Sequence, residues 1–318
     1  MKRRPFALTI IVMAATVLLF LGMVITLNSI GYHAGYVDPA QHRKLKRLSA
    51  KLEEGRQASV VFVGDSGLGR AVEEGRAGEL LGKPAAVYSL TGAFGYAGTY
   101  NMARRALRAN NPEVVVVFQS ILRMTGPDSV PGYVLTEEGL PNSEGPLLHQ
   151  RVTMYLSLTN AVAVARNLGN AAPAPARADE EVIREPVRTE RKKGGNERFR
   201  QLGWYRLSPD ALYPGKDQYL RLTGEACREA GVVCVYVHGP IYYRYCDGYE
   251  AYMEALNAKI AAAGFLILDP APRCVSEVEI DDTQDHIHWD LQQDFTAWYA
   301  QRLRAALALL PERPVIGN

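Results

Sequence analysis

The chain has 318 residues, of which 47% are hydrophobic, and its formal net charge at pH 7 is +2. This length is enough for one large globular domain or two small ones. The near-neutral charge and the lack of a broad basic face interleaved with aromatic residues exclude a nucleic-acid-binding signature.

The N-terminal stretch is typical of a membrane anchor. Phe6–Leu27 is apolar and uncharged, and Lys2, Arg3 and Arg4 precede it. A helix of this length crosses a hydrocarbon core of about 30 Å, and the basic end is expected to stay in the cytoplasm. The run is longer than the ~7–15 apolar residues of a cleaved signal peptide, the alternative, and no small-x-small site follows. We therefore expect residues 1–30 to be an uncleaved anchor in the inner (cytoplasmic) membrane, with the rest of this single-pass chain extracytoplasmic or periplasmic.

Residues 31–57 are expected to form a juxtamembrane helical stalk. Within them, Asp38–Glu54 places basic residues around Leu45, Leu48 and Leu52. This pattern predicts a polar helix that is either solvated or lies near lipid headgroups.

Residues 58–313 alternate between predicted strands and helices. The predicted strands are Val60–Val63, Ala85–Leu90, Glu113–Phe118, Val232–Val237 and Phe265–Leu268. The predicted helices are Thr99–Ala109, Lys216–Ala230, Tyr249–Ala263 and Leu291–Leu310. This alternation predicts a three-layer α/β domain, with a central parallel sheet of about five strands covered on both faces.

An insertion is expected at about residues 124–213, where the alternation lapses. Gln150–Leu168 has helical composition with an apolar face. Gly169–Asn196 is rich in Ala, Pro and mixed charge, which is typical of a mobile surface segment. The insertion is open to three interpretations: a lid, a surface for a partner, or a passive loop.

The four cysteines show no C-x-x-C spacing, which disfavours a zinc site. In an oxidising compartment an even number permits disulfides. Cys246 and Cys274 lie in predicted loops and can pair. Cys227 on a helix and Cys234 in a buried strand are expected to stay as core thiols, although the sequence leaves the pairing of the four cysteines open.

Ser66 is the candidate nucleophile. It stands in VVFVGDSGLG (Val60–Gly69), where a buried strand turns toward a helix that is expected to begin after Gly69. Site residues in open α/β folds gather at the carboxyl ends of the strands, and a helix N-terminus stabilises negative charge. The alternative is an ordinary turn in which Asp65 or Ser66 only caps the helix.

The segment Ile280–Asp290, IDDTQDHIHWD, carries the candidate base. In it Asp285 and His288 are spaced D-x-x-H, so one short loop supplies an imidazole and a carboxylate that orients it. His286 is a competing base and Asp282 a competing carboxylate.

Two other interpretations of this segment stay open. It could be a polar capping loop, with Asp285 or Asp290 at a helix N-terminus. It could also be a metal site with His238 as a further ligand, although Ser66 would then have no role.

Two further loops follow predicted strands at the same edge of the sheet. The loop from Thr91 to Gly98 is rich in glycine, which lets backbone N–H groups approach a ligand closely, although glycine also suits a plain connection. The strand Glu113–Phe118 ends in Gln119 and Ser120.

Gly64-Asp65-Ser66 and Asp285-x-x-His288 resemble the first and last blocks of the SGNH/GDSL hydrolase superfamily. The resemblance covers roughly Ser59–Leu310 and implies the three-layer, flavodoxin-like SGNH fold. It implies that Ser66 is the nucleophile, His288 the general base and Asp285 its partner.

The resemblance is incomplete at the middle blocks. The loop around Gly92 matches the second block loosely and implies an oxyanion donor there. The third block, Gly-x-Asn-Asp, is absent, and Gln119-Ser120 stands in its place. Gln119 is therefore the candidate side-chain donor, beside the backbone N–H of Ser66.

The anchor and the outward-facing domain are similar to the membrane-tethered proteins of envelope-polymer O-acylation, as in alginate O-acetylation and teichoic-acid D-alanylation. This similarity implies an O-acetyltransferase that works through an acyl-serine, without a cofactor or metal. The implied partners are an exported cell-envelope polysaccharide and a multispanning membrane acyltransferase. Two alternatives remain, an esterase or deacetylase of the same fold and a catalytically inactive SGNH-like scaffold.

Overall fold

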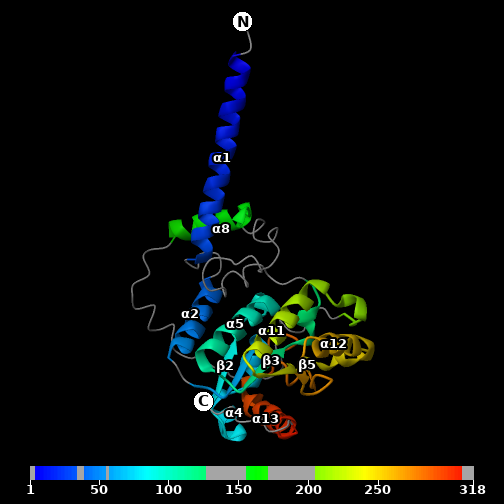
Figure 1. Cartoon of the computed structure of the whole chain (residues 1–318). Coiled ribbons are helices and arrows are strands. Elements are labelled where there is room, and N and C mark those ends of the chain that lie inside the picture. The colour runs from blue at the N-terminus through cyan, green and yellow to red at the C-terminus, as the bar shows by residue number, and fades with distance from the viewer. Residues whose placement is uncertain (1–3, 34–38, 55–56, 127–154, 171–204, 310–318) are drawn as a thin grey trace. The chain divides into compact units, whose positions relative to one another are not determined.

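The computed structural model describes residues 4–33, 39–54, 57–126, 155–170 and 205–309 (Figure 1). Contacts divide the chain into two units. The first comprises Met1–Arg47 with Val130–Glu185, and the second comprises Leu48–Ser129 with Pro186–Asn318.

The first unit contains the predicted apolar helix. Helix α1 spans Arg4–His33, and its segment Leu8–Gly31 is long and apolar enough to cross a membrane. Most of its large side chains are exposed, as expected for a helix surrounded by lipid. Helix α8 (Leu158–Asn170) belongs to the same unit and lies in the expected insertion. Most of residues 124–213 lie outside the described residues, including nearly all of the expected mobile segment Gly169–Asn196.

The second unit is built on a parallel sheet, which confirms the predicted α/β class. The described residues form five strands in the order β2-β1-β3-β4-β6. They are β1 (Val60–Gly64), β2 (Ala85–Ser89), β3 (Val114–Gln119), β4 (Val233–His238) and β6 (Leu266–Ile267). All residues of β1 and β3 are buried because helices cover both faces of the sheet.

Helices form the two outer layers (Figure 1). The helices around the sheet are α3 (Ser66–Ala71), α4 (Glu74–Leu81), α5 (Gly95–Asn110), α11 (Asp217–Glu229), α12 (Glu250–Ala262) and α13 (Gln292–Ala308). On one face α5 packs beside α11, and on the other α4 packs beside α13. Helix α12 contacts α11 and β6.

The predicted stalk is helical as α2 (Pro39–Glu53), but its last turns are not fully exposed to solvent. Leu48 and Leu52 are buried. Lys51 forms an ion pair with Glu74 on α4 and donates to the carbonyl of Val87. The end of α2 therefore packs on the α/β unit.

A small parallel sheet that the sequence did not predict joins β5 (Ile241–Tyr242) to β7 (Cys274–Val275). Tyr242 N–H also donates to the carbonyl of Gln284, 2.8 Å away. A disulfide between Cys246 and Cys274 crosslinks this region, which confirms the expected pair.

The expectation that Cys227 and Cys234 are free core thiols is wrong. They form a second disulfide, with Cα atoms 5.9 Å apart, between α11 and β4. Helix α11 ends at Glu229, and the short connection to β4 brings the two residues within bonding reach.

Replacing both Cys246 and Cys274 with serine should lower the free energy of unfolding by about 2–4 kcal/mol, because the crosslink restricts the unfolded chain. Urea unfolding of the two proteins, followed by circular dichroism, measures the difference. A thiol titration of the unreduced protein that found four free cysteines would contradict both disulfides.

Candidate active site

The candidate site lies where the strand order of the sheet changes direction. Strand β1 pairs with β2 on one side and with β3 on the other. In open α/β sheets ligands bind outside the carboxyl ends of the strands at such a point. Ser66 follows β1, and Gln119 ends β3.

Helix α3 begins at Ser66 itself. The sequence had suggested a start after Gly69. Asp65 is its N-cap, and its Oδ1 accepts from the N–H of Gly67 at 2.9 Å. A side chain at Gly64 would collide with the carbonyl oxygen of Phe118 on β3, so only glycine fits this close approach of two strands. The capping role expected as an alternative thus belongs to Asp65 and leaves the hydroxyl of Ser66 available.

The structure places His286, and not His288, on the serine. His286 Nε2 lies 2.7 Å from Ser66 Oγ, and His286 Nδ1 lies 2.6 Å from Asp282 Oδ1. A carboxylate only accepts hydrogen bonds, so Nδ1–H donates to Asp282 and Nε2 is left to accept from the hydroxyl of Ser66. The two competing residues from the sequence therefore complete a hydrogen-bonded chain, Ser66–His286–Asp282.

The backbone of this loop explains the exchange of roles. Ile280 and Ile287 form an antiparallel bridge, and Asp281 N–H donates to the carbonyl of His286. Asp282 and His286 thus flank a tight turn. His288 lies beyond the turn, buried at the start of a 3₁₀ turn (Trp289–Leu291), with Nδ1 3.9 Å from Asp281 Oδ1.

Asp282 is ionised over a wide pH range. Its hydrogen bond to His286 lowers its pKa to about 2, although burial acts in the opposite direction. The charges of His286 and Arg70 also lower this pKa. Arg70 lies 2.8 Å from Asp281 Oδ2 and 3.8 Å from Asp282 Oδ1, and it stacks on Trp289.

Asp285, expected to orient the base, binds Arg123 instead. Its Oδ2 accepts from Arg123 Nη2 at 2.9 Å, and its Oδ1 accepts from Thr283 Oγ1 at 2.7 Å. The side chain is buried, which alone would raise its pKa, but the charges of Arg123 and His286 and the hydrogen bond from Thr283 together outweigh burial and hold the pKa below its usual value.

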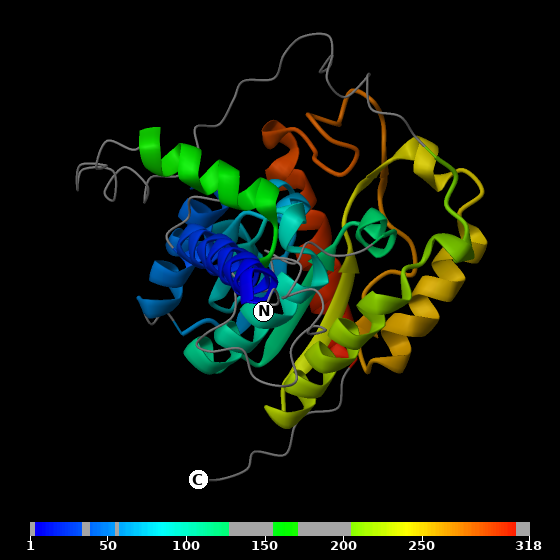
Figure 2. The same ribbon diagram turned by 90° about the horizontal axis from the view of Figure 1, so that it is seen from above.

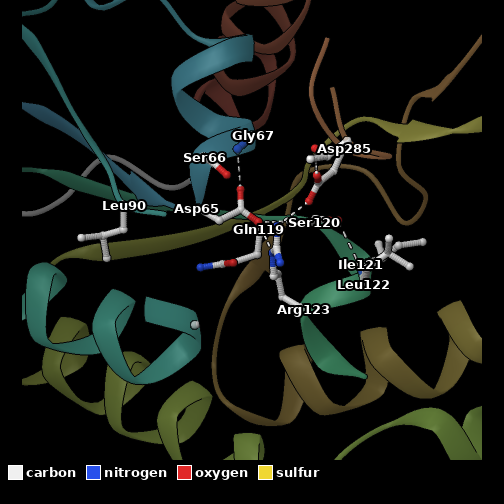
Figure 3. Close-up of polar contacts among 12 residues, drawn as sticks. Asp65, Ser66, Gly67, Leu90, Gln119, Ser120, Ile121, Leu122, Arg123 and Asp285 are labelled. Carbon is white, nitrogen blue, oxygen red and sulfur yellow. Dashed lines mark hydrogen bonds and ion pairs between the residues drawn. The ribbon is translucent and has the colours of Figure 1, made fainter. Parts of the chain in front are cut away.

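The same guanidinium binds the aspartate next to the serine (Figure 3). Arg123 Nε lies 3.2 Å from Asp65 Oδ2, which also accepts from the N–H of Ser120 at 3.1 Å. Arg123 comes from the 3₁₀ turn Ile121–Met124 after β3. We call Asp65–Arg123–Asp285 the ion cluster. Ser66 and His286 each directly follow one of its carboxylates.

The two expected oxyanion donors have different surroundings. Gly92 opens the 3₁₀ turn Gly92–Phe94, and a Cβ there would collide with the guanidinium carbon of Arg123, so a larger residue would displace that side chain. Gln119 is buried, and its Nε2 donates to Thr99 Oγ1 at 2.5 Å. In Figure 3 its side chain extends away from Ser66, so the structure does not bring this amide to the serine.

The described residues contain no group of three or more His, Cys, Asp or Glu side chains that could hold a metal ion. His238, the further ligand considered from the sequence, is buried at the end of β4. Its Nε2 lies 2.8 Å from Asn257 Oδ1, and burial lowers its pKa to about 4.

Sequence reasoning missed Arg123 because no motif marks it. One signal was present: the dipeptides Asp65-Ser66 and Asp285-His286 place an aspartate before each of two candidate residues. If one cation binds both aspartates, the residues that follow them are brought close together, which favours His286 over His288 as the partner of Ser66.

Replacing Arg123 with methionine should lower the free energy of unfolding by about 3–5 kcal/mol at pH 7, because two buried carboxylates lose their counter-charge. The loss should shrink at pH 5, because without Arg123 the pKa of the buried Asp285 rises and its carboxylate takes up a proton. Urea unfolding at both pH values measures it. Arg76→Met, which breaks an exposed pair with Glu79, is the control and should cost less than about 1 kcal/mol. Equal losses in the two variants would contradict a buried ion cluster.

Comparison of the sequence with protein-family models and with curated proteins gives no match. The resemblance to the SGNH/GDSL hydrolases therefore remains a prediction from the motifs of this chain. What the described residues do show is an α/β fold with a serine, a histidine and an aspartate joined by hydrogen bonds at the carboxyl end of its sheet.

Proposed function

We propose that the protein is a membrane-anchored serine acyltransferase that moves an acetyl group onto an exported cell-envelope polysaccharide. The observation that carries this proposal is the chain Ser66–His286–Asp282, with contacts of 2.7 and 2.6 Å. A serine that donates to an imidazole, which in turn donates to a carboxylate, is the arrangement that activates a hydroxyl as a nucleophile.

In the first half-reaction His286 Nε2 takes the proton of Ser66 while Oγ attacks the acyl carbonyl. The tetrahedral intermediate collapses when the leaving group departs with the proton from His286, and an acyl-serine remains. Asp282 stabilises the imidazolium that forms in between. In the second half-reaction a sugar hydroxyl gives its proton to His286 and attacks the acyl-serine, which restores Ser66.

The negative oxygen of the tetrahedral intermediate needs hydrogen-bond donors. We assign this role to the backbone N–H of Ser66 and to an N–H of the Gly92 turn, each contributing about 3 kcal/mol. Gln119 is not proposed as a donor because its amide is bound to Thr99.

The anchor supports an acceptor on the outer side of the inner membrane. Helix α1 is apolar enough to span a membrane, and the basic residues before it favour a cytoplasmic N-terminus. The domain would then be exposed on the outer side of the inner membrane, where exported polymers pass. A multispanning membrane acyltransferase is the proposed donor partner.

Hydrolysis is the second candidate, and the exposure of the site favours it. The side chain of His286 is 12% exposed and that of Asp282 is 34% exposed. Water can therefore compete with a sugar hydroxyl for the acyl-serine, and the same residues would then make an esterase.

Ser66→Ala and His286→Ala should each lower the turnover of a small activated acetyl ester by at least ~1,000-fold, because each removes a member of the hydrogen-bonded chain. His288→Ala is the matched control and should retain activity, since His288 does not contact the serine. Ester turnover by the purified chain, with the mass of Ser66 followed in parallel, measures this.

The same assay separates the candidate functions. An oligosaccharide that gains the mass of an acetyl group indicates transfer, and released acetate alone indicates hydrolysis. A folded protein with neither turnover nor acyl-serine would instead favour an inactive scaffold. Loss of activity in His288→Ala but not in His286→Ala would contradict the site described above.

Asp282→Asn should lower kcat by about 100–10,000-fold. It should also move the acid limb of kcat/KM to lower pH, since the imidazolium loses the anion that stabilises it. With a pKa of about 2, Asp282 itself does not titrate near neutral pH. Asp281→Asn, which changes a carboxylate paired with Arg70, is the control and should leave the limb nearly in place. An unmoved limb in Asp282→Asn would show that His286 is not the titrating base.

A further inference from the structure

Helix α8 is amphipathic. At 100° per residue, its apolar residues other than Ala163 fall on one side, whereas Thr159, Asn160 and Arg166 fall on the other. The apolar residues divide into two stripes. Ala161 and Val164 are buried, whereas Leu158 and Val162 are 54% and 52% exposed.

The start of α8 lies beside the C-terminal end of α1. The side-chain amide of Asn28 on α1 is buried and donates to the carbonyl oxygens of Tyr155, 2.8 Å away, and Ser157, 3.0 Å away. Val24, one turn earlier on α1, is buried too. Figures 1 and 2 show α8 running across α1 rather than along it.

For an α1 that spans a membrane, this crossing would fall near the edge of the bilayer. The apolar segment of α1 is Leu8–Gly31, and about 20 helical residues cross a hydrocarbon core of about 30 Å. Counted from Leu8, the core ends close to Asn28. A polar side chain at that depth needs hydrogen-bond partners, and the chain just before α8 supplies them.

We infer that α8 is an interfacial helix, lying in the leaflet at the C-terminal end of α1 with Leu158 and Val162 among the acyl chains. The occupant of this stripe is lipid because α8 packs against α1, whose exposed apolar side chains face lipid when that helix spans a membrane. Thr159 and Arg166 then face water, as in helices that lie flat in a membrane interface. This inference depends on α1 spanning the membrane and not on the enzymatic chemistry.

The test uses the full chain in phospholipid vesicles with one added cysteine that carries the fluorophore NBD. The native cysteines are disulfide-bonded, so the added thiol is labelled selectively. In Val162→Cys a lipid with a shallow doxyl group should quench the dye several-fold more than in Thr159→Cys. Iodide in the water should show the reverse order. Leu158→Cys, one turn from Val162, repeats the measurement.

A third position separates the two ways in which the inference can fail. Leu18→Cys, in the middle of α1, reports whether α1 is in the bilayer. If the dye at position 18 is quenched by lipid but the dyes at positions 162 and 158 behave like the dye at position 159, α8 is not interfacial. If the dye at position 18 is not quenched by lipid, α1 does not span the bilayer, and the inference about α8 is wrong as well. Neither result bears on the turnover at Ser66.

Discussion

The geometry of the candidate site depends on one half-buried cation, Arg123. Arg123 holds Asp65 and Asp285, and the residues that follow them are Ser66 and His286. Two loops that are 220 residues apart in the sequence are thereby joined at one guanidinium, next to the point where serine and imidazole meet. Because both carboxylates are buried, neither has a better partner than this arginine. The ion pairs of Arg123 thus connect the loop of Ser66 with the loop of His286, beside the chain Ser66–His286–Asp282.

The carboxylates at the site are grouped around two arginines. Four aspartates lie around the serine, and two arginines oppose them, with Arg123 on Asp65 and Asp285 and Arg70 on Asp281 and Asp282. Of these carboxylates, Asp282 is the one hydrogen-bonded to an imidazole. Its partial exposure leaves it close to solvent, while the carboxylates of the ion cluster are sealed from it.

Much of the fold was predictable because helices cover both faces of the sheet. The apolar runs in β1 and β3 identify them as central strands even when the neighbouring strands are not known. The start of α3 was not predictable in the same way, since the glycines after Ser66 have low helix propensity and the helix depends on the Asp65 cap. Ser66 could be proposed as a candidate because its turn is local. Which histidine lies on the serine could not be predicted, because the D-x-x-H spacing carries no information on the hairpin at Ile280–Ile287 or on the distant Arg123 that binds Asp285.

The crosslinked β5–β7 sheet has a consequence for where the site can assemble. Its Tyr242 holds the carbonyl of Gln284, which lies in the turn between Asp282 and His286. The Cys246–Cys274 bond that braces this sheet persists in an oxidising compartment and is reduced in the cytosol. In the proposed orientation, the turn that presents the imidazole would therefore be fully braced only on the outer side of the membrane. The compartment that preserves this disulfide would then also be the one that contains the proposed acceptor.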